Sequence, residues 1–212
     1  MANPAAASPA TLSLYLPVAR TIRKNLGGAA VFVKECFLKP KQMGAVVPSS
    51  AGLSRAMARW LPHNPREWVV ELGPGSGPVT DALLSRGLAH DRLLSIEKSP
   101  QLAKMLQERF PAVRVVEGDA GELDQVVFKH TGERQVGAVI SSLPLRSFPK
   151  DLEERVTRKI YEVLKPGGYW VQFTYHFYKR RINGSKPFDL HSTSMIWLNV
   201  PPARVLVYRK KG

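Results

Sequence analysis

The residues best suited to chemistry begin with a glycine-rich segment, Glu71-Leu-Gly-Pro-Gly-Ser-Gly77. This segment follows the apolar run Trp68–Leu72 directly and precedes Pro78–Arg86, whose apolar residues have helical spacing. Glycines between a strand and a helix free the backbone and let a ligand approach the turn closely. Glycines also make ordinary tight turns, so this segment predicts a binding site only together with the polar residues that follow it.

Those polar residues come at the ends of three further predicted strands. Glu97 ends one of them twenty residues after Gly77, where a carboxylate can accept hydrogen bonds from both hydroxyls of a ribose. Asp119 ends the next, where its carboxylate or the neighbouring backbone can meet an adenine amine, and Ser141-Ser142-Leu143-Pro144 ends the last. Because ligands of open parallel sheets bind beyond the carboxyl ends of the strands, we expect these residues to form one site.

The elements that must position this site alternate along the chain. The predicted strands are Trp68–Leu72, Arg92–Glu97, Val113–Glu117, Val136–Ser141 and Tyr169–Tyr175. Predicted helices are Pro78–Arg86, a helix capped by Ser99-Pro100 that ends before Pro111, and residues 151–164, which Pro166-Gly167-Gly168 stops. This order predicts an α/β fold with a doubly wound parallel sheet. The last two strands, Ser194–Asn199 and Arg204–Arg209, predict a hairpin.

The pattern resembles the class I S-adenosylmethionine-dependent methyltransferases over roughly residues 65–212, and Leu164-Lys-Pro-Gly-Gly168 looks like the turn before their fifth strand. The resemblance implies a Rossmann-like, seven-stranded, mostly parallel sheet with an antiparallel last strand, and S-adenosyl-L-methionine as the methyl donor, released as S-adenosyl-L-homocysteine. A nicotinamide enzyme is disfavoured because Gly77 departs from the spacing Gly-x-Gly-x-x-Gly. The implied donor-binding residues are Glu71, Gly73, Gly75, Ser76, Gly77, Glu97, Lys98, Gly118, Asp119, Ala120, Ser141 and Ser142.

The charge distribution indicates a polyanionic partner. The net charge is +14, yet residues 69–174 are neutral, with fourteen basic and fourteen acidic residues, and the excess lies in the two flanks. Such flanks suit anionic lipid or nucleic acid. The single cysteine, Cys36, excludes a disulfide framework and a Cys-rich metal site, and no metal is expected. Without a signal-peptide pattern or a membrane-spanning run, we expect a cytoplasmic protein.

The first 39 residues are predicted to form a disordered start and an amphipathic helix, and residues 40–212 the methyltransferase domain. On a helical wheel, the apolar side chains of Val18, Ile22, Leu26, Ala29, Val33 and Phe37 lie on one face, and Arg20, Arg23, Lys24 and Lys34 on the other. A helix of this kind can bind an anionic membrane or pack on its own domain. We expect it to bind the inner face of the cell membrane.

The segment Phe37–Ser50 and the sequence Ser142-Leu-Pro-Leu145 resemble bacterial phospholipid N-methyltransferases, and this resemblance extends from about Leu14 to the end of the chain. It implies methyl transfer to the head-group amine of phosphatidylethanolamine and its methylated forms, toward phosphatidylcholine. The motifs leave open how many methyl groups are added, and ornithine-lipid amines remain possible acceptors.

The main alternative is an rRNA adenine N6-dimethyltransferase, which has the same donor site and is also basic. That family has Asn-x-Pro-Tyr or Asn-x-Pro-Phe after the fourth strand, whereas this chain has Ser142 for the Asn and Leu145 for the aromatic ring. Base stacking is lost by that exchange, so no nucleic acid is expected as a partner. A small-amine or protein methyltransferase, and a non-catalytic membrane-binding module with the same fold, also remain open.

Candidate acceptor residues follow the fifth strand in Tyr175-His176-Phe177-Tyr178. His176 is predicted to accept the proton of the amine. Tyr175 and Tyr178 are predicted to hold the ammonium by cation–π contact. Ordinary packing is the alternative for each of them. The other predicted substrate-binding residues are Tyr15, which closes the site, Leu143 and Pro144, and the lipid-phosphate ligands Lys179, Arg180 and Arg181.

Overall fold

The computed structural model describes residues 50–175, 182, 184–199 and 201–212. The chain divides between Val46 and Val47, and every described residue belongs to the second unit. The predicted N-terminal amphipathic helix lies outside the described residues.

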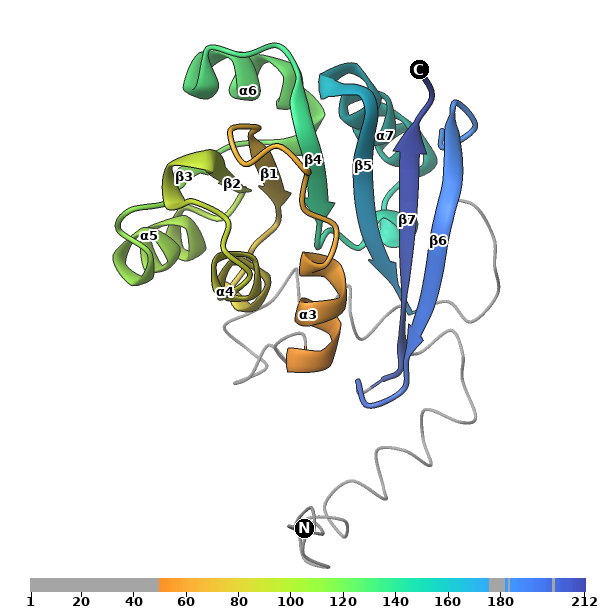
Figure 1. The fold of residues 1–212 in the computed structure, drawn as a ribbon, viewed down its shortest axis with the longest axis horizontal. Coiled ribbons are helices and arrows are strands. Elements are labelled where there is room, and N and C mark those ends of the chain that lie inside the picture. Colours follow the sequence, from red (N-terminus) through yellow and green to blue (C-terminus); the bar gives the residue numbers. More distant parts are fainter. Residues whose placement is uncertain (1–49, 176–181, 183, 200) are drawn as a thin grey trace, which may run out of the picture. The chain divides into compact units, whose positions relative to one another are not determined.

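The second unit is built on one seven-stranded sheet with the order β3-β2-β1-β4-β5-β7-β6 (Figure 1). The strands from β1 to β5 pair in parallel. Strand β7 is antiparallel to both β5 and β6. This topology confirms the predicted Rossmann-like sheet of seven strands with an antiparallel last strand. The strands are β1 Val69–Leu72, β2 Leu93–Glu97, β3 Arg114–Glu117, β4 Val136–Ser141, β5 Leu164–Thr174, β6 Phe188–Ile196 and β7 Ala203–Lys210.

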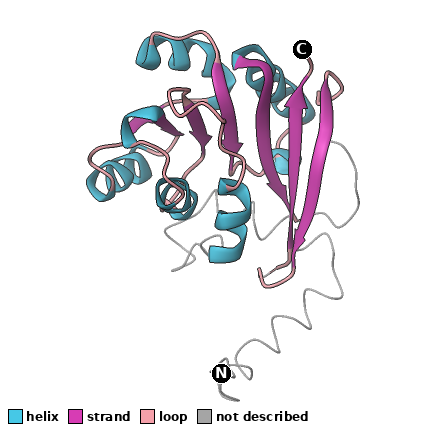
Figure 2. Ribbon diagram, in the orientation of Figure 1, coloured by secondary structure: helices cyan, strands magenta, loops and turns pink. Residues whose placement is uncertain are grey.

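Helices cover both faces of the sheet (Figure 2). Alternation along β1 explains the two layers, because successive side chains of a strand point to opposite faces. Val70 packs with residues of α6 and α7, whereas Val69 packs with residues of α3 and α4. The helices are α3 Ala51–Ala58, α4 Pro78–Ser85, α5 Pro100–Arg109, α6 Leu123–Thr131 and α7 Lys150–Val163, with short 3₁₀ turns η1 His90–Arg92, η2 Ala120–Glu122 and η3 Leu145–Ser147.

Side-chain caps fix where two of these helices begin. The Ser99 hydroxyl accepts a hydrogen bond from the backbone N–H of Leu102 at 3.4 Å, with Pro100 in the first turn, which confirms the predicted cap of α5. The Ser50 hydroxyl accepts one from the N–H of Leu53 at 3.2 Å and caps α3 in the same way. Such caps satisfy N–H groups that have no partner within the helix.

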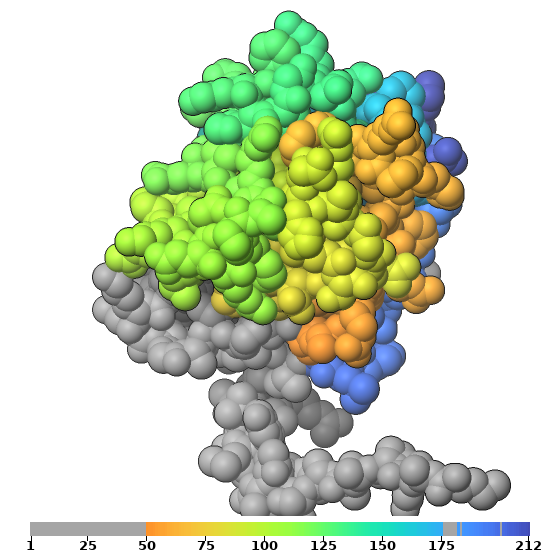
Figure 3. All heavy atoms as spheres, turned by 60° about the vertical axis from the view of Figure 1, so that its left-hand side comes forward, coloured from red at the N-terminus to blue at the C-terminus, as the bar shows by residue number. Residues whose placement is uncertain are grey.

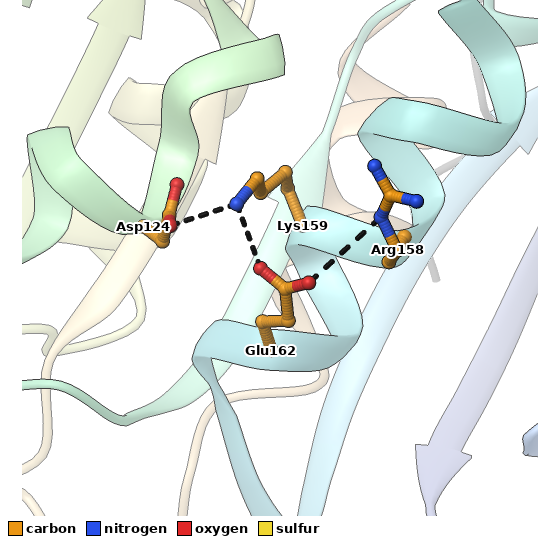
Figure 4. A network of polar contacts seen from close by, with 4 residues as sticks. All are labelled: Asp124, Arg158, Lys159 and Glu162. Atoms are coloured by element: carbon orange, nitrogen blue, oxygen red, sulfur yellow. Dashed lines mark hydrogen bonds and ion pairs between the residues drawn. The ribbon is translucent and has the colours of Figure 1, made fainter. Parts of the chain in front are cut away.

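Helix α6 was not among the predicted helices, and a polar network ties it to α7 (Figure 4). The Lys159 ammonium lies 2.8 Å from carboxylate oxygens of Asp124 in α6 and Glu162 in α7. Arg158 contacts the same Glu162 at 3.8 Å. The hydrogen bond from Lys159 is the largest cause of the lowered pKa of the Asp124 carboxyl.

The predicted bounds of β5 and β6 were wrong. Strand β5 begins at Leu164 rather than Tyr169, and the Pro-Gly-Gly turn interrupts its pairing with β4: Val136 pairs with Leu164, but Ala138 already pairs with Tyr169. A left-handed Gly167 (φ 76°) accommodates that irregularity. Strand β6 begins at Phe188 rather than Ser194, because its partly exposed residues lack a strict apolar alternation, and it ends at Ile196 before a turn.

Candidate active site

The carboxyl ends of neighbouring strands are joined by backbone hydrogen bonds that hold the candidate donor site together. The N–H of Gly73 donates to the carbonyl of Ile96 at 2.9 Å, and the N–H of Gly118 to that of Glu97 at 3.0 Å. On the other side of β1, the N–H of Ser142 donates to the carbonyl of Leu72 at 2.8 Å. The loops after β1, β2, β3 and β4 therefore meet at one edge of the sheet, as predicted.

The glycine loop is closed on one side and open on the other. Gly77, at φ 88°, precedes α4, and a Cβ added there would lie 2.7 Å from side-chain atoms of Leu106 in α5 and of Phe110 just after that helix. Gly75, at φ 58°, would have no heavy atom within 4 Å of an added Cβ. Only glycine adopts both conformations readily, and the open space over Gly75 lets a ligand approach the backbone. Arg109 holds the loop by donating to the carbonyl of Ser76 at 2.7 Å.

Glu97 ends β2 beside that opening, with 8% of its surface exposed. Its carboxylate accepts hydrogen bonds from the N–H of Gly75 at 3.2 Å and from the N–H of Ser99 at 3.0 Å. A carboxylate offers about four acceptor positions, so further acceptor capacity remains for a ligand. This arrangement fits a ribose diol.

Asp119 lies beyond β3 and pairs with Lys98 beyond β2. The Lys98 ammonium lies 2.8 Å from one carboxylate oxygen of Asp119, and the N–H of Gly121 donates to the other at 2.7 Å. The hydrogen bond from Lys98 is the largest cause of the lowered pKa of the Asp119 carboxyl. Gly118 and Ala120 flank Asp119, with Ala120 opening η2. This strand end presents an ionised carboxylate that can accept from an amine.

Glu71 lies within β1 and is completely buried. One carboxylate oxygen accepts hydrogen bonds from the Thr80 hydroxyl at 2.7 Å and the Ser95 hydroxyl at 2.8 Å. Its other oxygen has no partner among the described residues. Burial raises the pKa of Glu71 to about 7, although the two hydroxyls act in the opposite direction. An unsatisfied buried oxygen is costly, so a donor group or water at this point would stabilise the ionised form.

Hydrogen bonds with buried polar side chains hold the loop after β4 in place. Its backbone carbonyl at Leu143 accepts a hydrogen bond from the side-chain amide of Gln172 at 2.8 Å, and the Ser141 hydroxyl accepts one from the N–H of Leu143 at 3.4 Å. The hydroxyl of Ser142 is buried and has no partner among the described residues. Pro144 precedes η3, and Leu145 is 1% exposed and belongs to the core.

Of the predicted acceptor residues, Tyr175 falls within the described part of the chain. It is half-buried just beyond β5, where its ring packs edge-on against Phe173 at 5.3 Å. Six others, Tyr15, His176, Tyr178, Lys179, Arg180 and Arg181, lie outside the described residues.

Two polar residues inside apolar strands, Ser95 and Gln172, have roles in the site that were not predicted. A polar residue within an apolar strand indicates such a role. Ser95 stands within Leu-Leu-Ser-Ile and is paired in register with Glu71. Gln172 stands within Trp-Val-Gln-Phe and holds the loop after β4. Because buried polar groups need partners, each such residue indicates a second polar group nearby.

A groove of about 580 Å³ opens between α3 and α4 beside Ser76. Figure 3 shows these two helices, in orange and yellow, side by side. Three arginines line the groove, Arg55, Arg86 and Arg109, with Asp81 as the one acidic residue among the described lining residues. The surface beside the donor loop is therefore positively charged.

Two features are absent from the described residues. They contain no group of three or more His, Cys, Asp or Glu side chains able to hold a metal ion. None of their helices combines the length and apolar character needed to cross a bilayer.

Comparison with known proteins agrees with this geometry. Residues 69–168 match a family model described as a methyltransferase domain. The chain is 35% identical over 181 residues to the ornithine lipid N-methyltransferase of Singulisphaera acidiphila, a match covering 82% of this chain and 91% of that relative. It is 34% identical over 109 residues to the ribosomal RNA small subunit methyltransferase A of Acidobacterium capsulatum, covering 50% of this chain and 36% of that relative.

Among solved structures, a TehB-like S-adenosylmethionine-dependent methyltransferase from Corynebacterium glutamicum has the same fold. It superposes with a TM-score of 0.57 at 17% identity, over 85% of this chain and 99% of that one. The sheet order, the glycine loop followed by a carboxylate at the next strand end, and these matches lead to one assignment. The chain belongs to the class I methyltransferases, and its methyl donor is S-adenosylmethionine.

Proposed function

We propose that this enzyme methylates the head-group amine of a membrane lipid. The observation that carries the proposal is the extent of the match to the ornithine lipid N-methyltransferase, which includes 91% of that relative. A match confined to the donor-binding half would be uninformative about the acceptor. This one extends over 82% of the chain and therefore includes segments outside the donor site.

The loop after β4 supports a lipid over a nucleobase. Leu145, at the position where the rRNA enzymes have an aromatic ring, is 1% exposed and packs in the core. A side chain in that place offers no surface on which a base can stack. Ser142 has a buried hydroxyl in place of an amide that would reach the base.

The second candidate function is methylation of adenine in ribosomal RNA. The similarity to the ribosomal RNA small subunit methyltransferase A of Acidobacterium capsulatum favours it, but that match includes only 36% of the relative. The donor site is common to both candidates, so a match of this extent is expected under either of them.

We assign to the donor residues the roles that the sequence predicts. Glu97 would accept from the ribose hydroxyls, Asp119 and the backbone of Gly118 and Ala120 would meet the adenine, and the loop of Gly73, Gly75, Ser76 and Gly77 would lie against the rest. Glu71, with its unsatisfied oxygen, would meet the amino end directly or through water. Lys98, Ser141 and Ser142 complete this set. When bound, S-adenosylmethionine supplies a methyl group on a positively charged sulfur.

The acceptor amine must be positioned and must lose a proton. A lipid ammonium is mostly protonated at neutral pH, and a nearby base speeds proton removal. We assign that role to His176, and the aromatic surroundings of the ammonium to Tyr175, Tyr178 and Tyr15. Leu143 and Pro144 would line the acceptor side, and Lys179, Arg180 and Arg181 would bind the lipid phosphate where one is present.

The N-terminal segment, residues 1–39, would hold the enzyme on the inner face of the cell membrane, and residues 40–212 would form the methyltransferase domain. Because the enzyme would reach its acceptor at the anionic surface, its activity should rise with anionic lipid and fall with salt.

The deciding experiment supplies radiolabelled donor with vesicles containing phosphatidylethanolamine, vesicles containing ornithine lipid, and ribosomal RNA, each separately. The motifs of this chain favour phosphatidylethanolamine, and the name of the relative favours ornithine lipid. Label in either lipid supports the proposal, and the mass of the product gives the number of methyl groups added. Label in RNA with none in lipid rejects it. The Glu97→Ala variant controls for label that does not depend on the donor site.

A further inference from the structure

The turn after β6 carries two apolar side chains that are largely exposed. Trp197 is 67% exposed and Leu198 is 93% exposed. The other exposed large hydrophobic residues of the described chain, Met105, Phe128 and Leu190, are single side chains with no second one beside them in the sequence. Adjacent exposed Trp and Leu side chains point to a binding surface more strongly than scattered ones do.

This turn lies at the same edge of the sheet as the donor site. Thr174, the last residue of β5, pairs with Arg204 near the start of β7, so the turn before β7 projects past the carboxyl end of β5. Strands β1 and β4 run parallel to β5 and end at that edge with the glycine loop and the loop after β4. In Figure 1 the turn between β6 and β7 is the blue loop at the lower edge, beside α3.

The base of the turn is fixed while its tip is exposed. The side-chain oxygen of Asn199 accepts a hydrogen bond from the N–H of Ser50 at 3.0 Å, and its NH₂ group donates to the carbonyl of Pro201 at 2.7 Å. Ile196 packs on the start of α3, with a methyl group 3.6 Å from a Cβ added at Gly52. Figure 3 shows the blue turn against the orange helix. A fixed base lowers the entropy lost when the tip binds.

The surroundings of the tip are basic. Residues 50–66 and 190–212, which include α3, the turn and β7, contain no acidic residue. Arg55 is exposed on α3, and Arg204 pairs in register with Met195 near the turn. A Trp and an aliphatic side chain next to cations suit the interface of an anionic bilayer, where indole rings lie at head-group level.

We propose that Trp197 and Leu198 insert into the head-group layer of an anionic membrane and hold the donor edge of the sheet against the lipid surface. This inference rests on the proposed function, because a lipid acceptor is what gives the donor edge a reason to face a membrane. It adds a second membrane contact, separate in sequence from the N-terminal segment.

The test compares the Trp197→Ala/Leu198→Ala double variant with the wild-type chain in sedimentation with vesicles of phosphatidylglycerol and phosphatidylethanolamine. Phe128→Ala is the matched control, because Phe128 is 49% exposed but lies in α6, away from this edge. We expect the double variant to bind about tenfold or more weakly, and the control to match the wild type. Trp197→Phe, which keeps an aromatic ring, should retain most of the binding.

Lipids brominated along their acyl chains give an independent readout, since they quench only tryptophans close to the bilayer. They should quench the wild type more than the Trp197→Phe variant. Equal vesicle binding by wild type and double variant overturns the inference. Self-association that the double variant loses in the absence of vesicles also overturns it, because a second copy of the chain would then cover the tip.

Activity separates this inference from the proposed function. On vesicles the double variant should methylate lipid more slowly, and on a short-chain lipid dissolved as monomers it should equal the wild type. Equal rates in both assays reject the membrane contact and leave the lipid substrate intact. If the wild type labels neither the vesicle lipid nor the short-chain lipid, but the double variant still loses vesicle binding, the proposed function is rejected and the membrane contact stands.

Discussion

The carboxylate of Glu97 accepts a hydrogen bond from the backbone N–H of Gly75 at 3.2 Å, across 22 residues of sequence. The residue expected to bind the ribose therefore also ties the glycine loop to the end of β2. Donor binding and loop position are coupled through one side chain, which shapes how its variants should behave.

Glu97→Ala should abolish tight donor binding and leave the fold intact. The variant loses the two hydrogen bonds that we expect from the ribose hydroxyls to the charged carboxylate, each worth roughly 1.5–3 kcal/mol. We therefore expect at least a hundredfold weaker affinity in isothermal titration calorimetry. Glu108→Ala, an exposed glutamate of α5, is the matched control and should bind as the wild type does. Unchanged affinity in Glu97→Ala would reject the placement of the ribose.

Glu71 should make the stability of the donor-free protein depend on pH. Burial raises its pKa from 4.5 to about 7, so the folded state binds a proton more tightly than the unfolded state does. This tighter proton binding stabilises the folded state. Its contribution to the free energy of unfolding is fully present below about pH 4.5 and is lost as pH rises through about 7. The difference in pKa corresponds to roughly 3 kcal/mol.

The measurement is urea unfolding of wild type and Glu71→Gln at pH 5 and pH 8. The free energy of unfolding of the wild type relative to the variant should fall by about that amount between the two values. Glu117→Gln, an exposed carboxylate of β3, controls for general charge effects. A constant difference between wild type and Glu71→Gln would mean that the buried carboxyl titrates normally.

The fold was predictable because its signals are local. Short apolar runs that lead to Gly73, Glu97 and Gly118-Asp119 defined the strands, and the Ser99-Pro100 cap defined the start of α5. The start of β6 was missed because an edge strand with one exposed face lacks the continuous apolar run of a buried one. The first residues of β5 were missed for another reason: Pro166-Gly167-Gly168 predicts a turn, whereas in the structure it forms an irregularity within the strand.

The position of the donor-site residues was predictable, because a carboxylate at a strand end, such as Glu97, is visible in the sequence; its contact with the ribose stays a prediction. Contacts between distant elements were not predictable. The bond from Ser50 to Asn199 joins residues 149 positions apart, and neither residue type indicates the other. The exposure of Trp197 and Leu198 was not predictable either. The sequence places both at the end of a predicted strand, whereas in the structure β6 ends at Ile196 and the two residues form a turn.

Asn199 should stabilise the join between α3 and the turn. It is 3% exposed, and Asn199→Ala would leave the N–H of Ser50 and the carbonyl of Pro201 without this partner. An unsatisfied buried group costs about 1–3 kcal/mol, which lowers the melting temperature by roughly 2–10 °C in a domain of this size. Calorimetric melting checks this. Asn64→Ala, which removes an exposed turn contact, should change the melting temperature by much less. Equal effects would contradict a special role for Asn199.

Removing residues 1–36 should leave donor affinity largely unchanged and weaken binding to anionic vesicles. The prediction follows from the basic and apolar faces of that segment, since each Lys or Arg near an anionic surface contributes about 1 kcal/mol. Co-sedimentation of full-length and truncated protein with phosphatidylglycerol vesicles is the measurement. If both sediment equally, the segment only packs on the protein, and the tip formed by Trp197 and Leu198 would suffice for docking.

His176→Ala should lower turnover far more than donor affinity. A general base contributes about 10²- to 10⁴-fold to a proton transfer, so a fall of that size is expected in the initial rate on vesicle lipid. Donor affinity by calorimetry should stay within about threefold, which also shows that the variant is folded. Tyr175→Phe should be milder than Tyr175→Ala because the face of the ring survives, and the Ala variant should harm later methyl transfers most, since methylated ammonium groups depend more on aromatic contact. A parallel loss of turnover and donor affinity in His176→Ala would assign that side chain to the structure of the site instead of to proton transfer.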